Sequence, residues 1–294
     1  MKITNDCRFG AAVLAGGLLA AAMAGPAAFA AAAAPPAKPA APVKVVPFHT
    51  DRIEGINISG TWQMQGKFYA ANGTPVDRRI TKDADGKPVE LLPWAQAIYD
   101  KNIAAERAGI AIVSSQARCL PHGMPQMLYA APAPIQILQT PGQITFLHEL
   151  GRHVRVVNMN AQHDPDAYPT YFGDDVGHWE GDTLVIDTIQ LTDKTTIDRL
   201  LMPHTDNLHV VERIKVVSAD QLDFELTLDD PKTFVRPWKM KFTWVRQPPG
   251  IKVIEYICAD GNQNETDENG GLTYPGANIK SVAGATIENT GGAK

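Results

Sequence analysis

Residues 176–189 read VGHWEGDTLVIDTI, and this stretch decides the fold class. Its two arms, 176–179 and 183–189, are short runs rich in apolar and β-branched side chains. Between them Glu180-Gly181-Asp182 forms a tight-turn sequence in which glycine can adopt a positive φ. A turn this short predicts antiparallel neighbours, because parallel strands need a long crossover connection. The stretch therefore predicts a β-hairpin.

Period-two runs joined by short turns continue on both sides of this hairpin. The predicted strands cover residues 58–65, 135–139, 144–150, 153–159, 176–179, 183–189, 208–217, 222–228, 239–245 and 252–257. A long antiparallel meander tends to close on itself, because closure removes its unpaired edges. We expect a mainly β protein whose meander forms a lipocalin-like up-and-down barrel of about 9–10 strands, and a two-sheet sandwich is the alternative. One short helix is expected near residues 93–107, with Pro93 in its first turn and Gly109 after its end.

The first residues of the chain predict export. Lys2 and Arg8 precede a run from Gly10 to Ala24 without a charged side chain, and Ala28-Phe29-Ala30 has the small-x-small pattern of a cleavage site. Residues 1–30 are therefore expected to be a signal peptide and residues 31–52, rich in Ala and Pro, a disordered spacer. A single barrel domain over 53–265 and a flexible tail over 266–294 follow. The apolar run is shorter than a bilayer-spanning helix needs, so no transmembrane segment is expected after cleavage; a permanent membrane anchor is the alternative.

The charge of the chain excludes two classes of partner. It has 27 basic and 32 acidic side chains and a net charge of −5. Cleavage of the signal removes Lys2, Arg8 and Asp6, which changes the net charge to −6. A mildly acidic chain without a basic cluster is a poor nucleic-acid binder. It also lacks the polybasic amphipathic helix of a protein that lies on a membrane surface.

Two cysteines remain after processing, Cys119 and Cys258. In an oxidising compartment two cysteines of one chain usually pair. We expect a Cys119–Cys258 disulfide that closes a long loop and stabilises the fold by about 2–4 kcal/mol. Two buried thiols are the alternative.

Four segments look familiar as a set: CLPHGMP at 119–125, VGHWEGDTLVIDT at 176–188, LHVVER at 208–213 and EYIC at 255–258. Together they resemble a family of exported bacterial proteins that carry a GRWEGDTLVVDT-like stretch and a late EYxC; His178 stands where that pattern has Arg. The resemblance implies export and supports the cysteine pairing, since both cysteines lie inside its motifs, but it implies no activity. Gly60-Thr61-Trp62 also resembles the Gly-x-Trp of lipocalin first strands.

Charged side chains fall in apolar rows of the predicted strands. Glu212 alternates with Val210 and Ile214, and Asp187 lies between Val185 and Ile189. A carboxylate in such a row must be paired, hydrogen-bonded or protonated. One interpretation is that Glu212, Asp187 and Arg155 converge inside the barrel, where Glu212 and Asp187 are the candidate catalytic acid and base. The other is a structural ion-pair network that fills the barrel.

A wider set of side chains could bind a ligand. The candidates are Arg155, Glu149, Tyr171, Trp179, Glu212 and Glu255. Tyr171 belongs to an aromatic loop at 168–172, which we interpret either as the lid of a barrel mouth or as an ordinary structured loop.

Motifs for metal, cofactor and nucleophilic chemistry are absent from the sequence. His148 and His153 flank a turn, but no HxH or HExxH spacing exists, and no metal site is expected. There is no GxSxG nucleophile motif and no phosphate-binding glycine-rich loop, so no cofactor is expected.

Three hypotheses for function remain, all of them in the periplasm or outside the cell. The first is an exported barrel that binds a small apolar or aromatic ligand inside. The second is a cofactor-independent acid–base enzyme, an isomerase, lyase or hydrolase that uses buried carboxylates. The third is an interaction or envelope-associated protein with a solid barrel. A cavity would eliminate the third, and a carboxylate and a second titrating group that share that cavity would favour the second.

Overall fold

The computed structural model describes residues 53–66, 80–108, 112, 114–129 and 133–258, and two short strands at 265–266 and 272–273. The signal peptide and spacer predicted over residues 1–52, and most of the tail predicted over 266–294, lie outside the described residues.

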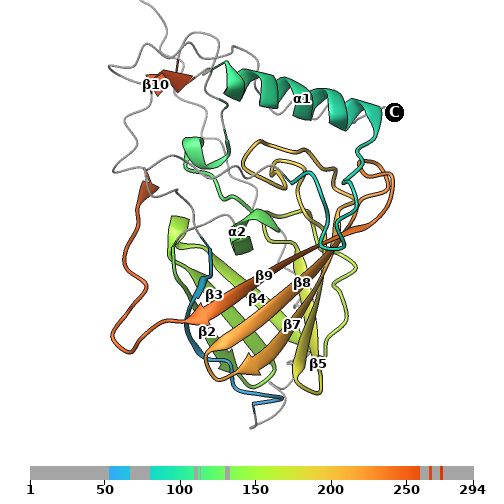
Figure 1. Cartoon of the computed structure of the whole chain (residues 1–294). Coiled ribbons are helices and arrows are strands. Elements are labelled where there is room, and N and C mark those ends of the chain that lie inside the picture. Colours follow the sequence, from blue (N-terminus) through green and yellow to red (C-terminus); the bar gives the residue numbers. More distant parts are fainter. Residues whose placement is uncertain are drawn as a thin grey trace, which may run out of the picture. The chain divides into compact units, whose positions relative to one another are not determined.

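The described chain forms a closed β-barrel of nine strands that follow one another in sequence order (Figure 1). Their bounds are β1 Gly60–Met64, β2 Ile135–Thr140, β3 Gln143–His148, β4 Val154–Met159, β5 Asp174–Glu180, β6 Thr183–Ile189, β7 His209–Ser218, β8 Gln221–Asp229 and β9 Trp238–Arg246. The barrel closes where β1 pairs antiparallel with β9 through Trp62 and Arg246. The mainly β barrel predicted from the sequence is therefore confirmed, and the sandwich is not formed. A separate pair of two-residue strands, β10 Glu265–Thr266 and β11 Leu272–Thr273, lies outside the barrel sheet.

Two details of the predicted meander are wrong. β4 and β5 run parallel, with Asn158 opposite Val176, and residues 252–257 form no strand. The two errors are connected. Strand direction can alternate all the way round a closed barrel only if the number of strands is even. Nine strands therefore require a parallel pair, and the crossover loop 160–173 returns the chain to the end of the barrel where β4 began.

A stacked pair of side chains lies at one end of the barrel. Tight turns at 140–143, 181–182 and 218–221 mark this end, here called the base; the opposite end is called the mouth. The guanidinium of Arg246 lies 4.2 Å from the ring centroid of Trp62, whose Nε1 donates to the carbonyl of Ile58. Gly60 allows this approach, because its φ is +148° and a Cβ there would lie 2.1 Å from the Arg246 side chain.

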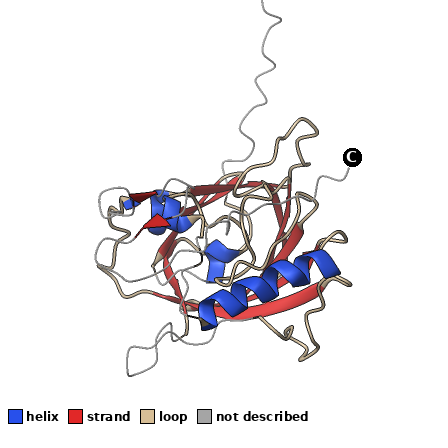
Figure 2. Cartoon of the chain, turned by 90° about the horizontal axis from the view of Figure 1, so that it is seen from above, coloured by secondary structure: helices blue, strands red, loops and turns tan. Residues whose placement is uncertain are grey.

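Side chains from the inner faces of the strands and an inserted helical turn pack inside the barrel. Phe146, Phe224 and Trp244 are fully or almost fully buried on the inner faces. Helix α2, Gln126–Tyr129, carries the buried Leu128, whose carbonyl accepts a hydrogen bond of 3.1 Å from Trp244 Nε1. Seen from above, α2 lies within the ring of strands (Figure 2). The segment 124–129 thus acts as a plug.

Helix α1, Pro93–Arg107, has the predicted bounds. Tyr99 and Asn102 on its buried face bond to Asp198 and to the carbonyl of Leu201, so α1 packs on the connection between β6 and β7. Two short 3-10 turns, η1 Gln116–Arg118 and η2 Leu150–Arg152, complete the described elements. None of the helices in these ranges is long and apolar enough to cross a membrane.

Candidate functional site

Four polar side chains meet inside the barrel near its mouth. Arg155, Asp175, Thr188 and Glu212 lie on the inner faces of the consecutive strands β4, β5, β6 and β7, and all four are buried. Nη2 of Arg155 is 2.7 Å from Asp175 Oδ1 and 2.5 Å from Glu212 Oε1. Thr188 accepts from Arg155 at 3.1 Å and donates to Asp175 at 2.6 Å. We call these four residues the Arg155 network.

Each guanidinium nitrogen of Arg155 and each carboxylate oxygen of Asp175 and Glu212 makes at least one hydrogen bond within the network. Asp175 accepts from both Nε and Nη2 of Arg155, and Glu212 accepts from both Nη1 and Nη2. Burial acts to lower the pKa of Arg155, but the two carboxylates outweigh burial and raise that pKa above its ordinary value. Burial raises the pKa of Glu212, although the Arg155 charge opposes the rise. Such a network is costly to disturb, because any unpaired member would be left buried without solvent.

The predicted meeting of Asp187 with Glu212 and Arg155 is wrong. The register pairs Ile186 with Glu212, so Ile186 points inward and Asp187 points outward. Asp187 instead accepts hydrogen bonds of 2.9 Å on the outer face from His163 and from His209. The two candidate catalytic carboxylates therefore lie on opposite sides of the barrel wall.

Asp187 is part of a chain of four side chains on that outer face. His163, in the crossover loop, reaches Asp174 on β5 through Nδ1 at 2.8 Å and Asp187 on β6 through Nε2 at 2.9 Å. Partial burial acts to lower the pKa of His163, but the hydrogen bonds to the two carboxylates outweigh burial and raise it. The imidazolium form can donate to both carboxylates at once, so it holds the loop against the wall.

The other predicted ligand-binding residues do not join the network. Glu149 and Glu255 lie outside, at the rim of the mouth, where Glu149 accepts from the backbone of Ile254 and Glu255 pairs with Arg152 at 2.6 Å. Trp179 lies on the inner face of β5 near the base, against Gly55. Tyr171 contributes its backbone carbonyl to Met124 N at the edge of the plug. Of the predicted set, only Arg155 and Glu212 share a site.

Sequence reasoning missed Asp175 and Thr188. The predicted strand begins at Val176, whereas β5 begins at Asp174, so the prediction omits Asp175. Extending the alternation of Gly177 and Trp179 backwards by one step would have placed Asp175 on the inner face. Thr188 lies in a strand that is apolar on both faces, so the pattern carries no signal for it.

Two buried histidines have ring nitrogens without a partner among the described residues. They are His148, with both nitrogens, and His122, with Nε2. Burial, followed by the Arg155 charge, lowers the pKa of His148 to about 3, and burial lowers that of His122 to about 4. Phe172 of the aromatic loop stacks on His148 with ring centroids 5.8 Å apart. Both imidazoles are therefore neutral near pH 7.

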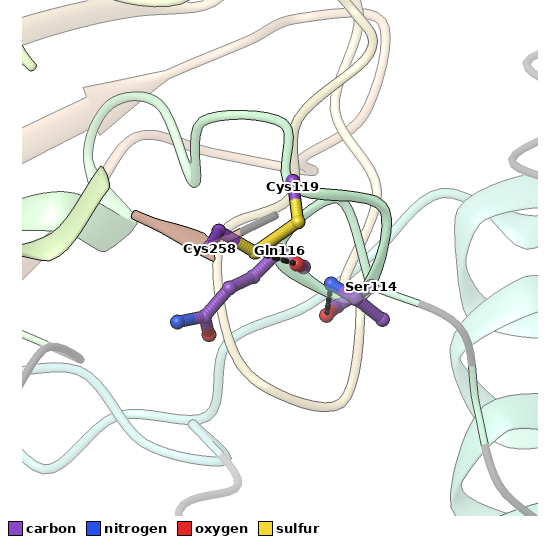
Figure 3. The surroundings of a disulfide bond; sticks show 5 residues. Ser114, Gln116, Cys119 and Cys258 are labelled. Atoms are coloured by element: carbon purple, nitrogen blue, oxygen red, sulfur yellow. Dashed lines mark hydrogen bonds between the residues drawn. A yellow bond between two sulfur atoms is a disulfide. The ribbon is translucent and has the colours of Figure 1, made fainter. Parts of the chain in front are cut away.

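Cys119 and Cys258 are paired as predicted. Cys119 and Cys258 form a disulfide with a Cα–Cα distance of 5.4 Å across 139 residues (Figure 3). The bridge joins the segment that follows β9 to the turn after η1. It borders a hollow of about 20 Å³ that His122 and His153 also line. A hollow of this size accommodates about one water molecule.

A larger hollow lies outside the barrel, at its base. It measures about 560 Å³ and is lined by residues that include Thr61, Arg246, Pro248 and Ile251. Arg246 already donates to the carbonyls of Ala219 and Ser59 and stacks on Trp62. The Arg246 guanidinium thus makes its contacts within the base of the barrel.

Metal-type ligands do not gather in the described part of the chain, where no group of three His, Cys, Asp or Glu side chains could hold an ion. No family model and no curated protein matches this chain.

Proposed function

We propose that this chain is an exported protein with a filled barrel, which acts by binding a partner at its outer surface and not by converting a substrate. The observation that carries the proposal is the Arg155 network. Each guanidinium nitrogen of Arg155 and each carboxylate oxygen of Glu212 bonds to another member of the network. The neighbouring interior is occupied by aromatic side chains and by Leu128 of the plug. This arrangement is typical of a rigid scaffold.

Export rests on three supports. The sequence of residues 1–30 has the three parts of a signal peptide. The motif set that includes residues 176–188 resembles exported bacterial proteins. Cys119 and Cys258 form a disulfide, a bond that persists in oxidising compartments such as a periplasm or the extracellular medium. Mass spectrometry of the protein recovered from the periplasm tests this point, and a mature chain that begins at Ala31 is expected.

The acid–base alternative has weaker support. A general acid and a general base must reach the same substrate, which requires both groups within about 3 Å of the reacting atoms. Glu212 is inside the barrel with both oxygens on Arg155, whereas Asp187 is outside between two histidines. The two carboxylates therefore cannot serve one reaction centre.

Uptake of apolar probes tests the filled interior. The mature protein is titrated with 1-anilinonaphthalene-8-sulfonate and, separately, with benzene, and neither is expected to bind saturably. Leu128→Ala is the positive control, because truncating a fully buried leucine opens an apolar cavity of the kind that accepts benzene. Stoichiometric, saturable uptake of either probe by the unmodified protein at neutral pH would contradict the proposal.

A second candidate, a small ligand bound near the mouth, is favoured by one observation. His148 is buried beside Arg155 and Phe172, and both its ring nitrogens lack a partner among the described residues. A buried polar group without a partner costs about 1–3 kcal/mol, which a ligand could recover. Native mass spectrometry of the periplasmic protein would then detect a bound small molecule, and His148→Phe would lose it.

A further inference from the structure

One wall of the barrel carries no charge on its outer face. Alternation along β1, β2, β3 and β4 directs every second side chain outward. The outward residues are Thr61, Gln63, Gln136, Leu138, Thr140, Gln143, Thr145, Leu147, Val154, Val156 and Asn158. All of them are uncharged. We call this surface the neutral face.

The centre of the neutral face is aliphatic and exposed. The register places Leu138, Thr145 and Val156 side by side across β2, β3 and β4, and Gln136, Leu147 and Val154 on a neighbouring row. Leu138, Val154 and Val156 are exposed, Val154 to 55%. Apolar side chains that cluster on a surface, unlike single ones, mark an interaction site.

The opposite wall of the barrel is charged on its outer face. The outer faces of β5 to β9 carry ion pairs, among them Arg213 with Glu180 and Lys239 with Glu225. Figure 1 shows β2, β3 and β4 on one wall of the barrel and β7, β8 and β9 on the other. The charges of the sheet are therefore segregated on one side.

We infer that the neutral face binds a second copy of this chain in a two-fold arrangement. The inference rests on the proposed function and names its partner. In a two-fold interface each face meets itself, so a charged face would meet its own charges. Each mature chain has a net charge of −6, and contact through the neutral face keeps the charged walls apart. Its Gln, Asn and Thr side chains both donate and accept, so they can bond to copies of themselves.

The charges at the rim argue against a lipid surface. Where the neutral face meets the mouth, Arg152 is paired with Glu255, and Glu149 lies beside Ile254. A face that binds an anionic membrane needs an excess of basic side chains around its apolar centre. This rim has no such excess.

The area of the neutral face limits the affinity of the dimer. Four strands spaced about 4.8 Å apart, each about six residues long at about 3.3 Å per residue, cover about 400 Å². A stable interface buries about 800 Å² per partner, so the dimer is weak and reversible. Ile254, 66% exposed and attached to Glu149 at the end of β3, extends the apolar surface at the rim.

Sedimentation velocity over about a hundredfold range of protein concentration tests the inference. The mature protein is expected to pass from monomer to dimer with increasing concentration. Val154→Glu and Val156→Glu each place a charge against its own copy and are expected to weaken association by at least about tenfold. Val217→Glu is the matched control, because Val217 is 48% exposed at the end of β7 on the charged wall. It should associate like the unmodified protein.

Circular dichroism and the melting temperature establish that each variant is folded. Two independent Val→Glu variants are used, so that the test remains possible if one of them does not fold. A mature chain that remains monomeric throughout, or a dimer that both face variants leave intact, would overturn the inference. Neither result affects the filled-barrel proposal, which only probe uptake contradicts. Conversely, a barrel that takes up 1-anilinonaphthalene-8-sulfonate contradicts the proposed function whatever its state of association.

Discussion

Arg155 Nη2 lies 2.5 Å from Glu212 Oε1, and this pair joins β4 to β7 across the barrel interior, over the two strands between them. The same nitrogen also meets Asp175 on β5 and Thr188 on β6. One cation therefore ties four consecutive strands together. It does so at the β4–β5 pair, whose ladder has only two matched positions. The network thus reinforces the shortest ladder in the barrel wall.

The first prediction concerns this cation. Arg155→Met leaves Asp175 and Glu212 buried without a counter-charge and is expected to lower the free energy of unfolding by about 3–5 kcal/mol. Replacing all three ionic partners, in the variant Arg155→Met with Asp175→Val and Glu212→Leu, should recover most of that loss, because apolar groups of similar volume need no partner. Urea unfolding followed by tryptophan fluorescence measures both. A single variant within 1 kcal/mol of the unmodified protein would contradict a structural role.

The second prediction concerns the stability of the fold in acid. Burial lowers the pKa of His148 to about 3 in the folded state from 6.5. Between these pH values His148 is protonated in the unfolded chain and neutral in the folded chain. Stability therefore falls as the pH decreases from 6.5 towards 3. His148→Phe keeps the stacking on Phe172 and removes this loss. Its unfolding free energy is expected to vary less between pH 7 and pH 4.5 than that of the unmodified protein.

The third prediction concerns His163, which affects the pH dependence of stability in the opposite direction to His148. The carboxylates of Asp174 and Asp187 raise the pKa of His163 above 6.5. Its contribution to stability is therefore complete below pH 6.5 and is lost as the pH increases through the raised folded value. His163→Gln should destabilise the protein more at pH 5.5 than at pH 9. Hydrogen exchange in the crossover loop 160–173 is the direct readout, and faster exchange is expected in the variant at the lower pH only. Equal destabilisation at both values would show that His163 acts through packing and not through its charge.

The sequence predicts the barrel well and its interior less well, for a physical reason. Alternation identifies inward positions wherever one face of a strand is polar, and so it placed Glu212 in an apolar row. In β6 both faces are apolar, and alternation alone cannot decide whether Asp187 or Thr188 points inward. That choice depends on the register between β6 and β7, which pairs residues from different parts of the chain.

The sequence does not predict the parallel β4–β5 pair, because it indicates ten strand segments and the barrel has nine strands. Ten predicted strands could close with every neighbour antiparallel, whereas nine cannot. Residues 252–257 have the composition of a strand but leave the sheet, because β1 already occupies the free edge of β9. The polar loop 160–173 was the available signal, since it is long enough for a parallel crossover.

The last prediction concerns the disulfide, which replaces strand pairing as the attachment of residues 251–258. Besides the bridge itself, the hydrogen bond from Ile254 N to Glu149 and the ion pair of Arg152 with Glu255 hold this segment. Both are exposed, and exposed ion pairs contribute little. The double variant Cys119→Ser with Cys258→Ser should therefore release the segment and lower the unfolding free energy by about 2–4 kcal/mol. Limited proteolysis should cut the variant after residue 246 before the barrel is attacked. If the segment stays protected without the bridge, its attachment comes from contacts other than the disulfide.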